Sequence, residues 1–219
     1  MNDARTSPIR AAIFDIGGVL TVSPVHRIID FCRRHGIPDE VRYAIFAPHD
    51  GPWGRFERSE IGPEAFAAEF DALVHPTGAA VTGREFLEWF GQGFEPRPEM
   101  IAVVRHLRGR LRLGCITNNV PADGRGRERP FDPYELFDVV VESSKVGLRK
   151  PDPRIYLLAC EQLGIAPAEA VFLDDLGENL KAARALGMVT IKVDPSPSAI
   201  DELERILGWP LPRQHEDLS

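Results

Sequence analysis

Short apolar runs alternate with amphipathic helical patterns along most of this 219-residue sequence, and this alternation constrains the fold more than any other feature. The apolar runs lie at residues 11–14, 112–117, 137–141, 170–173 and 188–193, and helical patterns occupy residues 98–108, 153–163 and 178–186. Apolar runs of this length are typical of buried strands. Strands that alternate with helices usually form a parallel sheet covered by helices on both faces. The sequence therefore predicts an α/β fold with a Rossmann-like core.

The stretch from residue 21 to residue 97 interrupts the alternation. It carries helical patterns near residues 25–35, 39–46, 63–73 and 83–90 and has no convincing strand. We expect residues 21–97 to form an inserted α-helical cap, and residues 1–20 and 98–219 to form the α/β core. Trp53 lies in the insertion, and we interpret it as part of the cap interior in preference to a platform for substrate.

Polar residues stand where three of the predicted strands end. Asp15 follows the first run, Thr117 and Asn118 end the second, and Asp174 and Asp175 follow the fourth. In parallel sheets, ligands bind outside the carboxyl ends of the strands. The sequence therefore predicts that these five residues share one site.

The adjacent pair Asp174 and Asp175 indicates a cation. Two neighbouring carboxylates repel each other, and burying both is costly unless a positive charge is close. Carboxylate oxygens are hard ligands of the kind that Mg²⁺ prefers. We therefore expect Mg²⁺ as the cofactor.

Four short motifs occur in the order found in one known family. Residues 14–20 (FDIGGVL) resemble its first motif, Thr117-Asn118 the second, Lys150-Pro151 the third, and Asp174-Asp175 with Asn179 the fourth. On these motifs the chain resembles the haloacid dehalogenase superfamily. Within that superfamily its pattern is most similar to the phosphatase domain of soluble epoxide hydrolase and to bacterial glucose-1-phosphatase-type members.

The resemblance implies a phosphatase that hydrolyses a small phosphorylated metabolite through an aspartyl-phosphate intermediate. Asp15 would be the nucleophile, and Thr117, Asn118 and Lys150 would bind the phosphoryl group. The Mg²⁺ ligands would be Asp15, the carbonyl of Gly17, and Asp175. Asp174 would orient Lys150 or a metal-bound water, and Asn179 is expected to have a structural role beside it.

One position departs from the family pattern. Most phosphatases of the family carry an Asp where this chain has Gly17, and that Asp protonates the leaving oxygen. Such acid–base help is worth about 10²–10⁴ in rate. Two alternatives therefore stay open, namely a metal-independent dehalogenase-type hydrolase and a catalytically impaired binding protein.

Composition narrows the class of partner. The formal net charge is −7, which disfavours nucleic acid, and no apolar run approaches the roughly 18 residues of a membrane span. The three cysteines form no C-x-x-C pair, so zinc and a disulfide framework are not expected. We expect a cytoplasmic protein, either a monomer or a homodimer. The arginine-rich segment 123–129 would either grip an anionic substrate or form a solvated loop.

Overall fold

The computed structural model describes residues 8–47, 49–121, 132–194 and 196–213. Its centre is a five-stranded sheet in the order β3-β2-β1-β4-β5, and every neighbouring pair of strands is parallel. The strands are β1 (Ala11–Phe14), β2 (Arg112–Thr117), β3 (Val139–Glu142), β4 (Ala170–Asp174) and β5 (Val189–Lys192). The chain leaves β1 toward β2 and β3 and returns to the other side of β1 for β4 and β5. This confirms the predicted Rossmann-like α/β core.

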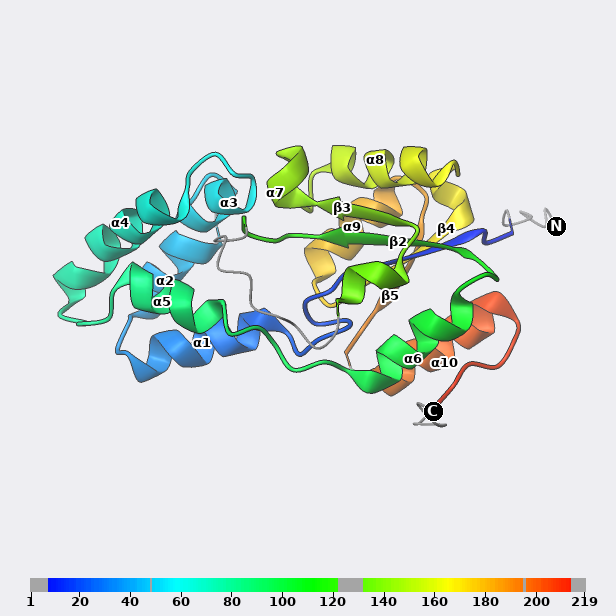
Figure 1. The fold of residues 1–219 in the computed structure, drawn as a ribbon, viewed down its shortest axis with the longest axis horizontal. Coiled ribbons are helices and arrows are strands. Elements are labelled where there is room, and N and C mark those ends of the chain that lie inside the picture. The colour runs from blue at the N-terminus through cyan, green and yellow to red at the C-terminus, as the bar shows by residue number, and fades with distance from the viewer. Residues whose placement is uncertain (1–7, 48, 122–131, 195, 214–219) are drawn as a thin grey trace.

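Helices cover both faces of this sheet (Figure 1). The helices α6 (Pro98–Leu107) and α10 (Ser196–Leu207) cover one face, and α8 (Pro153–Leu163) and α9 (Gly177–Ala185) cover the other. Side chains of a strand point alternately to the two faces. Accordingly, Ala12 and Phe14 of β1 pack in the α6/α10 layer, whereas Ala11 and Ile13 pack in the α8/α9 layer. All four side chains are fully buried, so β1 is the centre of the core.

The predicted elements are present with small shifts at their ends. The third strand begins at Val139, two residues later than expected, and α8 has the predicted bounds. The sequence reasoning missed α10, the short helices α3 (Pro52–Glu57) and α7 (Ser143–Val146), and 3₁₀ turns at His75–Thr77, Pro133–Leu136 and Pro167–Glu169. A proline at residue 197 resembles a helix breaker, but the first turn of a helix tolerates it because no backbone N–H is needed there. Among the described residues, no helix has the length and apolar character that crossing a bilayer requires.

Residues 24–90 form a group of five helices that we call the helical unit. Its members are α1 (Pro24–Arg34), α2 (Asp39–Phe46), α3 (Pro52–Glu57), α4 (Pro63–Val74) and α5 (Gly83–Phe90). They lie together beside the sheet and its covering helices (Figure 1). Their buried side chains form a hydrophobic cluster of their own, rich in aromatic rings, in which Trp53 is almost fully enclosed. The exact division into cap and core remains a prediction.

Two chain segments that run side by side connect the helical unit to the rest. The backbone N–H of Val22 donates to the carbonyl of Glu95 at 2.8 Å, and the N–H of Arg97 donates to the carbonyl of Leu20 at 2.7 Å. The outgoing and returning segments are therefore hydrogen-bonded to each other close to the end of β1. This arrangement places the start of α1 next to the carboxyl edge of the sheet.

Candidate active site

Asp15 is the first residue after β1, at the carboxyl edge of the sheet. Its backbone continues the β1–β4 pairing through an N–H···O bond of 3.0 Å to Leu173, which fixes the direction of the side chain. The carboxylate Oδ1 accepts a 2.7 Å hydrogen bond from the backbone N–H of Ile16. Asp15 is buried, with 7% of its surface exposed. The strand therefore delivers a fixed carboxylate to the predicted site.

Lys150 provides a buried positive charge between two carboxylates. Its Nζ lies 2.7 Å from Oδ2 of Asp15 and 2.8 Å from Oδ2 of Asp174, and only 1% of the residue is exposed. A buried ammonium of this kind persists only when it is paired, because desolvation is costly. Lys150 therefore joins the ends of β1 and β4 electrostatically.

The pKa values of Asp15, Lys150 and Asp175 are all raised, through different balances of burial and neighbouring charge. Burial raises the pKa of Asp15 to about 7; Lys150 opposes this shift, and Asp174 adds to it. Burial lowers the pKa of Lys150, but the two carboxylates outweigh it and leave that pKa above its usual value. Burial also raises the pKa of Asp175, in spite of a hydrogen bond from Ser23. The site thus holds three carboxylates and a single lysine, whose one positive charge does not balance them when all three are ionised.

Asp174 is held on both of its oxygens. Oδ1 accepts from the backbone N–H of Leu176 at 2.8 Å, and the Nδ2 of Asn179 donates to Oδ1 and Oδ2 at 3.0 and 3.1 Å. Oδ2 also receives Lys150. A carboxylate with this many donors suits an orienting role, which is the role expected of Asp174, and Asn179 is its support.

Asp175 rests against the turn that follows β1. A Cβ added to Gly18 would lie 2.1 Å from Oδ2 of Asp175, and Gly18 has a φ of +80°. Only glycine meets both requirements without strain. On the same oxygen Asp175 accepts a 2.7 Å hydrogen bond from the hydroxyl of Ser23. Ser23 is the N-cap residue of α1, but its side chain makes no cap hydrogen bond, so its hydroxyl serves Asp175 instead.

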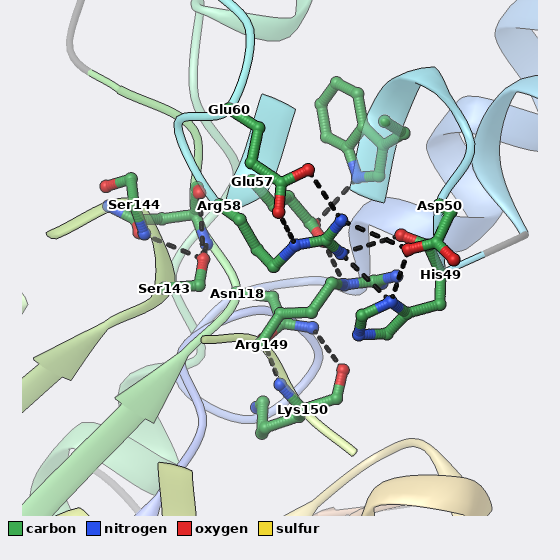
Figure 2. Close-up of polar contacts among 12 residues, drawn as sticks. His49, Asp50, Glu57, Arg58, Glu60, Asn118, Ser143, Ser144, Arg149 and Lys150 are labelled. Carbon is green, nitrogen blue, oxygen red and sulfur yellow. Dashed lines mark hydrogen bonds and ion pairs between the residues drawn. The ribbon is translucent and has the colours of Figure 1, made fainter. Parts of the chain in front are cut away.

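Thr117 and Asn118 bring the end of β2 to the same place. Thr117 is the last residue of β2 and is buried. The Oδ1 of Asn118 accepts from the backbone N–H of Lys150 at 2.8 Å, and its Nδ2 donates to the Lys150 carbonyl at 3.1 Å (Figure 2). Asn118 thus clamps the backbone of Lys150, a structural task that its position in the sequence did not reveal.

Three carboxylates meet at the carboxyl ends of β1 and β4. Asp15, Asp174 and Asp175 each offer an oxygen, and these oxygens lie within 4.8 Å of one another. Hard oxygen donors at this spacing, in a site that burial makes costly for negative charge, fit a divalent cation such as Mg²⁺. The part of the Gly17 carbonyl in metal binding stays a prediction.

Gly17 has an ordinary backbone. Its φ lies outside the left-handed region, unlike that of Gly18. A Cβ at Gly17 would lie 3.0 Å from Cδ and 3.1 Å from Cγ of Pro24, the first residue of α1. A side chain there requires α1 to give by a few tenths of an ångström. Glycine at this position therefore permits the close approach of α1 to the turn.

Comparison with known proteins decides the family. The model of the haloacid dehalogenase-like hydrolases matches residues 9–187, a range that contains all four motifs. The chain belongs to this family. As a haloacid dehalogenase-like hydrolase, it is 50% identical to rat bifunctional epoxide hydrolase 2 over 93% of this chain and 40% of that protein. It is 34% identical to a phosphatase of Mycobacterium tuberculosis over 91% of this chain and 94% of that protein.

Solved structures of the family share the fold of this hydrolase. A predicted haloacid dehalogenase-like hydrolase from Porphyromonas gingivalis superposes with a TM-score of 0.70 at 24% identity, covering 92% of this chain and 98% of that one. A family enzyme from Bacteroides thetaiotaomicron, solved with magnesium and inorganic phosphate, gives a TM-score of 0.64 at 22% identity over 84% and 93% of the two chains. The chain spans less than half the length of the mammalian relatives that it matches. Two relatives that the chain matches over nearly their whole length, from Aspergillus oryzae and Mycobacterium tuberculosis, are phosphatases by name.

Of the residues that the sequence nominated, contacts in the structure bring together Asp15, Asn118, Lys150, Asp174, Asp175 and Asn179. Thr117 lies at the end of β2, the strand next to β1. Sequence reasoning missed Ser23 and the reason for Gly18. The Ser-Pro pair at the start of α1 is an ordinary N-cap signal, so it gave no hint of a contact with Asp175. His26 and His49 are exposed. The arginine-rich segment 123–129 lies outside the described residues.

Proposed function

We propose that this hydrolase is a Mg²⁺-dependent phosphatase acting on a small organic phosphomonoester. The observation that carries the proposal is the meeting of Asp15, Asp174 and Asp175 around Lys150 at the carboxyl edge of the sheet. Asp15 would serve as the nucleophile and, together with Asp175, as a cation ligand, whereas Asp174 would orient the lysine that balances the charge. The phosphatase among its relatives, and the magnesium and phosphate bound by the Bacteroides enzyme, support this assignment.

The reaction proceeds in two displacements at phosphorus. In the first, a carboxylate oxygen of Asp15 bonds to phosphorus while the bond to the ester oxygen breaks, which gives an aspartyl phosphate and an alkoxide that takes up a proton from water. In the second, water attacks phosphorus, releases inorganic phosphate and restores the carboxylate. Thr117 and the backbone N–H of Asn118 would donate to the phosphoryl oxygens, and Lys150 would offset their charge.

Asp15, Asp175 and the Gly17 carbonyl would hold the ion. When bound, Mg²⁺ supplies positive charge next to the phosphoryl oxygens and relieves the repulsion among the acids. Ser23 and the Gly18 backbone keep Asp175 in place. Asp174, which Asn179 and Leu176 hold, keeps Lys150 aligned with Asp15.

The leaving oxygen must gain a proton, and Gly17 cannot give one. A substrate whose leaving group is already acidic, such as an anomeric sugar oxygen, needs this help least. We therefore expect a good leaving group in the natural substrate.

The helical unit is the natural cover for this site. We assign residues 21–97 to a cap and residues 1–20 and 98–219 to the core. The start of α1 reaches the site through Ser23 and Pro24. Closure of a cap excludes water from the attack on phosphorus.

A phosphate-release screen tests the proposal. The protein would be incubated with a panel of phosphomonoesters and with p-nitrophenyl phosphate, in Mg²⁺ and in EDTA. Release that depends on Mg²⁺ is expected for at least one ester. Halide release from 2-haloacids in EDTA would favour the dehalogenase alternative. Binding of phosphate without release from any ester would favour the impaired binding protein.

A further inference from the structure

The last residue of α3, Glu57, is a carboxylate buried where the helical unit contacts the core. Glu57 is 5% exposed, and its Oε1 accepts a 2.8 Å hydrogen bond from Nε1 of Trp53. Trp53 itself is fixed by the aromatic rings of Phe46 and Phe66. Glu57 is thus anchored to the interior of the helical unit, although its other carboxylate oxygen points to the core.

That second oxygen meets a core arginine next to the proposed active site. Oε2 of Glu57 lies 2.8 Å from Nε of Arg149, with both side chains largely buried (Figure 2). The two atoms are close without the alignment of a hydrogen bond, so the attraction is between charges. Burial raises the pKa of Glu57, against the positive charges of Arg149 and Lys150. This ion pair joins the end of α3 to Arg149, the residue before Lys150.

A second contact with the core lies two residues further along the chain. The hydroxyl of Ser59 donates to the carbonyl of Ser144 at 2.6 Å, and Ser59 has a φ of +57°, which is unusual for a residue with a side chain. Ser144 in turn is held by Asn119, whose Oδ1 accepts from its backbone N–H at 3.2 Å. The segment 57–59 therefore touches two core segments, the short helix α7, which Asn119 holds, and the loop that carries Arg149 and Lys150, which Asn118 holds.

We propose that Glu57 is a positioning residue for Lys150, acting through Arg149 across the contact between the helical unit and the core. The proposal rests on the proposed phosphatase function. Asn118 and Asn119 follow Thr117 directly, and each holds one of the two core segments that the segment 57–59 contacts. When the segment 57–59 contacts the core, it fixes the backbone of Arg149 and Lys150. The position of the Lys150 ammonium, which pairs with Asp15, is then fixed as well.

The test compares Glu57→Gln with a matched control, Glu60→Gln. Gln at 57 keeps an acceptor for Trp53 and removes the charge that attracts Arg149. The Nε of Arg58 donates to Oε1 of Glu60 at 2.6 Å, so Glu60 is paired inside the helical unit and not with either of the two core segments. Amide hydrogen exchange over residues 143–150 is the first readout, since the N–H groups of Ser144 and Lys150 bond to the two asparagines. We expect exchange there to become about tenfold faster in Glu57→Gln and to stay unchanged in Glu60→Gln.

Kinetics on p-nitrophenyl phosphate with Mg²⁺ give the second readout. Misplacement of Lys150 should lower kcat by on the order of ten- to 100-fold, with KM changed by less than about threefold. Glu57→Gln, Arg149→Met and the double variant should show similar losses, because they break one unit. Recovery in the double variant would instead show that an uncompensated arginine caused the loss.

Each result decides something definite. Unchanged exchange in Glu57→Gln would overturn the docking, and faster exchange with unchanged kcat would overturn the positioning role. Additive losses in the double variant would mean that Glu57 does not act through Arg149. If wild-type protein releases no phosphate, the proposed function fails, yet the exchange measurement still shows whether Glu57 holds the Lys150 loop.

Discussion

The carboxyl edge of the sheet and the helical unit bury opposite kinds of side chain. At the sheet edge, Asp15, Lys150 and Asp174 are buried together, with Lys150 1% exposed and Asp174 completely enclosed. In the helical unit, aromatic rings such as Phe66 and Phe86 fill the interior. Burying rings gains stability, whereas burying charges costs it unless every charge is paired. The side chains buried in the helical unit therefore stabilise the folded protein, whereas those buried at the edge of the sheet cost stability.

This difference shows where function resides. A region in which pattern, packing and burial agree is built for stability, and a region that violates those rules is usually a functional site. By that criterion the carboxyl edge is the site. Within the helical unit the same criterion singles out Glu57 and Arg58, the charged residues buried among its rings.

The largest expected effect is the loss of turnover in Asp15→Asn. The amide cannot form an acyl phosphate, so phosphate release should fall by on the order of 10⁴-fold or more, equivalent to about 5 kcal/mol. Stability should not fall, because burial raises the pKa of Asp15 and a neutral amide costs less to bury. Phosphate release and the melting temperature together check this. A variant that is inactive because its melting temperature has collapsed would contradict the comparison.

The opposite pattern is expected for Phe86→Ala in the helical unit. Phe86 is fully buried and packs against Phe31, Trp53 and Phe70. Removing the ring should lower the free energy of unfolding by about 3–5 kcal/mol, measured by urea denaturation. Tyr43→Ala is the control, because Tyr43 is 63% exposed, and it should change stability by less than about 0.5 kcal/mol. Mg²⁺ should still raise the melting temperature of Phe86→Ala, since the acids lie in the core.

Gly18→Ala should have a smaller effect that involves both stability and the site. A left-handed φ costs alanine about 1–2 kcal/mol, and the new methyl would also displace the carboxylate of Asp175. Gly36→Ala is a close control, since Gly36 has a φ of +70° and open space around its Cβ position. Gly36→Ala should lose only the cost of the left-handed backbone, whereas Gly18→Ala should lose more stability, and only Gly18→Ala should weaken the rise in melting temperature caused by Mg²⁺. Equal responses to Mg²⁺ in the two variants would argue against Asp175 as a ligand.

The strands of the sheet could be predicted because each one is a short apolar run that can be recognised from its own residues. Apolar runs between helical patterns located β1 and β2 to the residue. The order of the strands was not predicted, because it depends on contacts between distant segments. The helix α10 was overlooked because its early proline resembles a stop signal, although a first turn accepts one.

The acids of the site could also be predicted, but not what holds them. Asp15 and Asp174 stand at strand ends, where the topology of a parallel sheet gathers them. The contacts of Ser23 and Glu57 with the core depend on how the helical unit is placed, and no local pattern records that placement. Gly18 was visible only as a turn residue, because its second task is to make room for Asp175.

The smallest expected effect is a gain from restoring an acid at position 17. The φ of Gly17 allows a side chain, but its Cβ would crowd Pro24 at 3.0 Å, so Gly17→Asp alone should lower the melting temperature. The double variant Gly17→Asp/Pro24→Ala removes that crowding, with Pro24→Ala as its control.

On simple alkyl phosphates the double variant should turn over up to about tenfold faster than the control, a part of the full general-acid effect. On p-nitrophenyl phosphate, whose leaving oxygen needs no proton, the two should be equal. A folded double variant that gains nothing on alkyl esters would show that another group already supplies the proton. A gain of equal size on both substrates would point to an effect of position 17 on metal binding, because only proton donation distinguishes the two leaving groups.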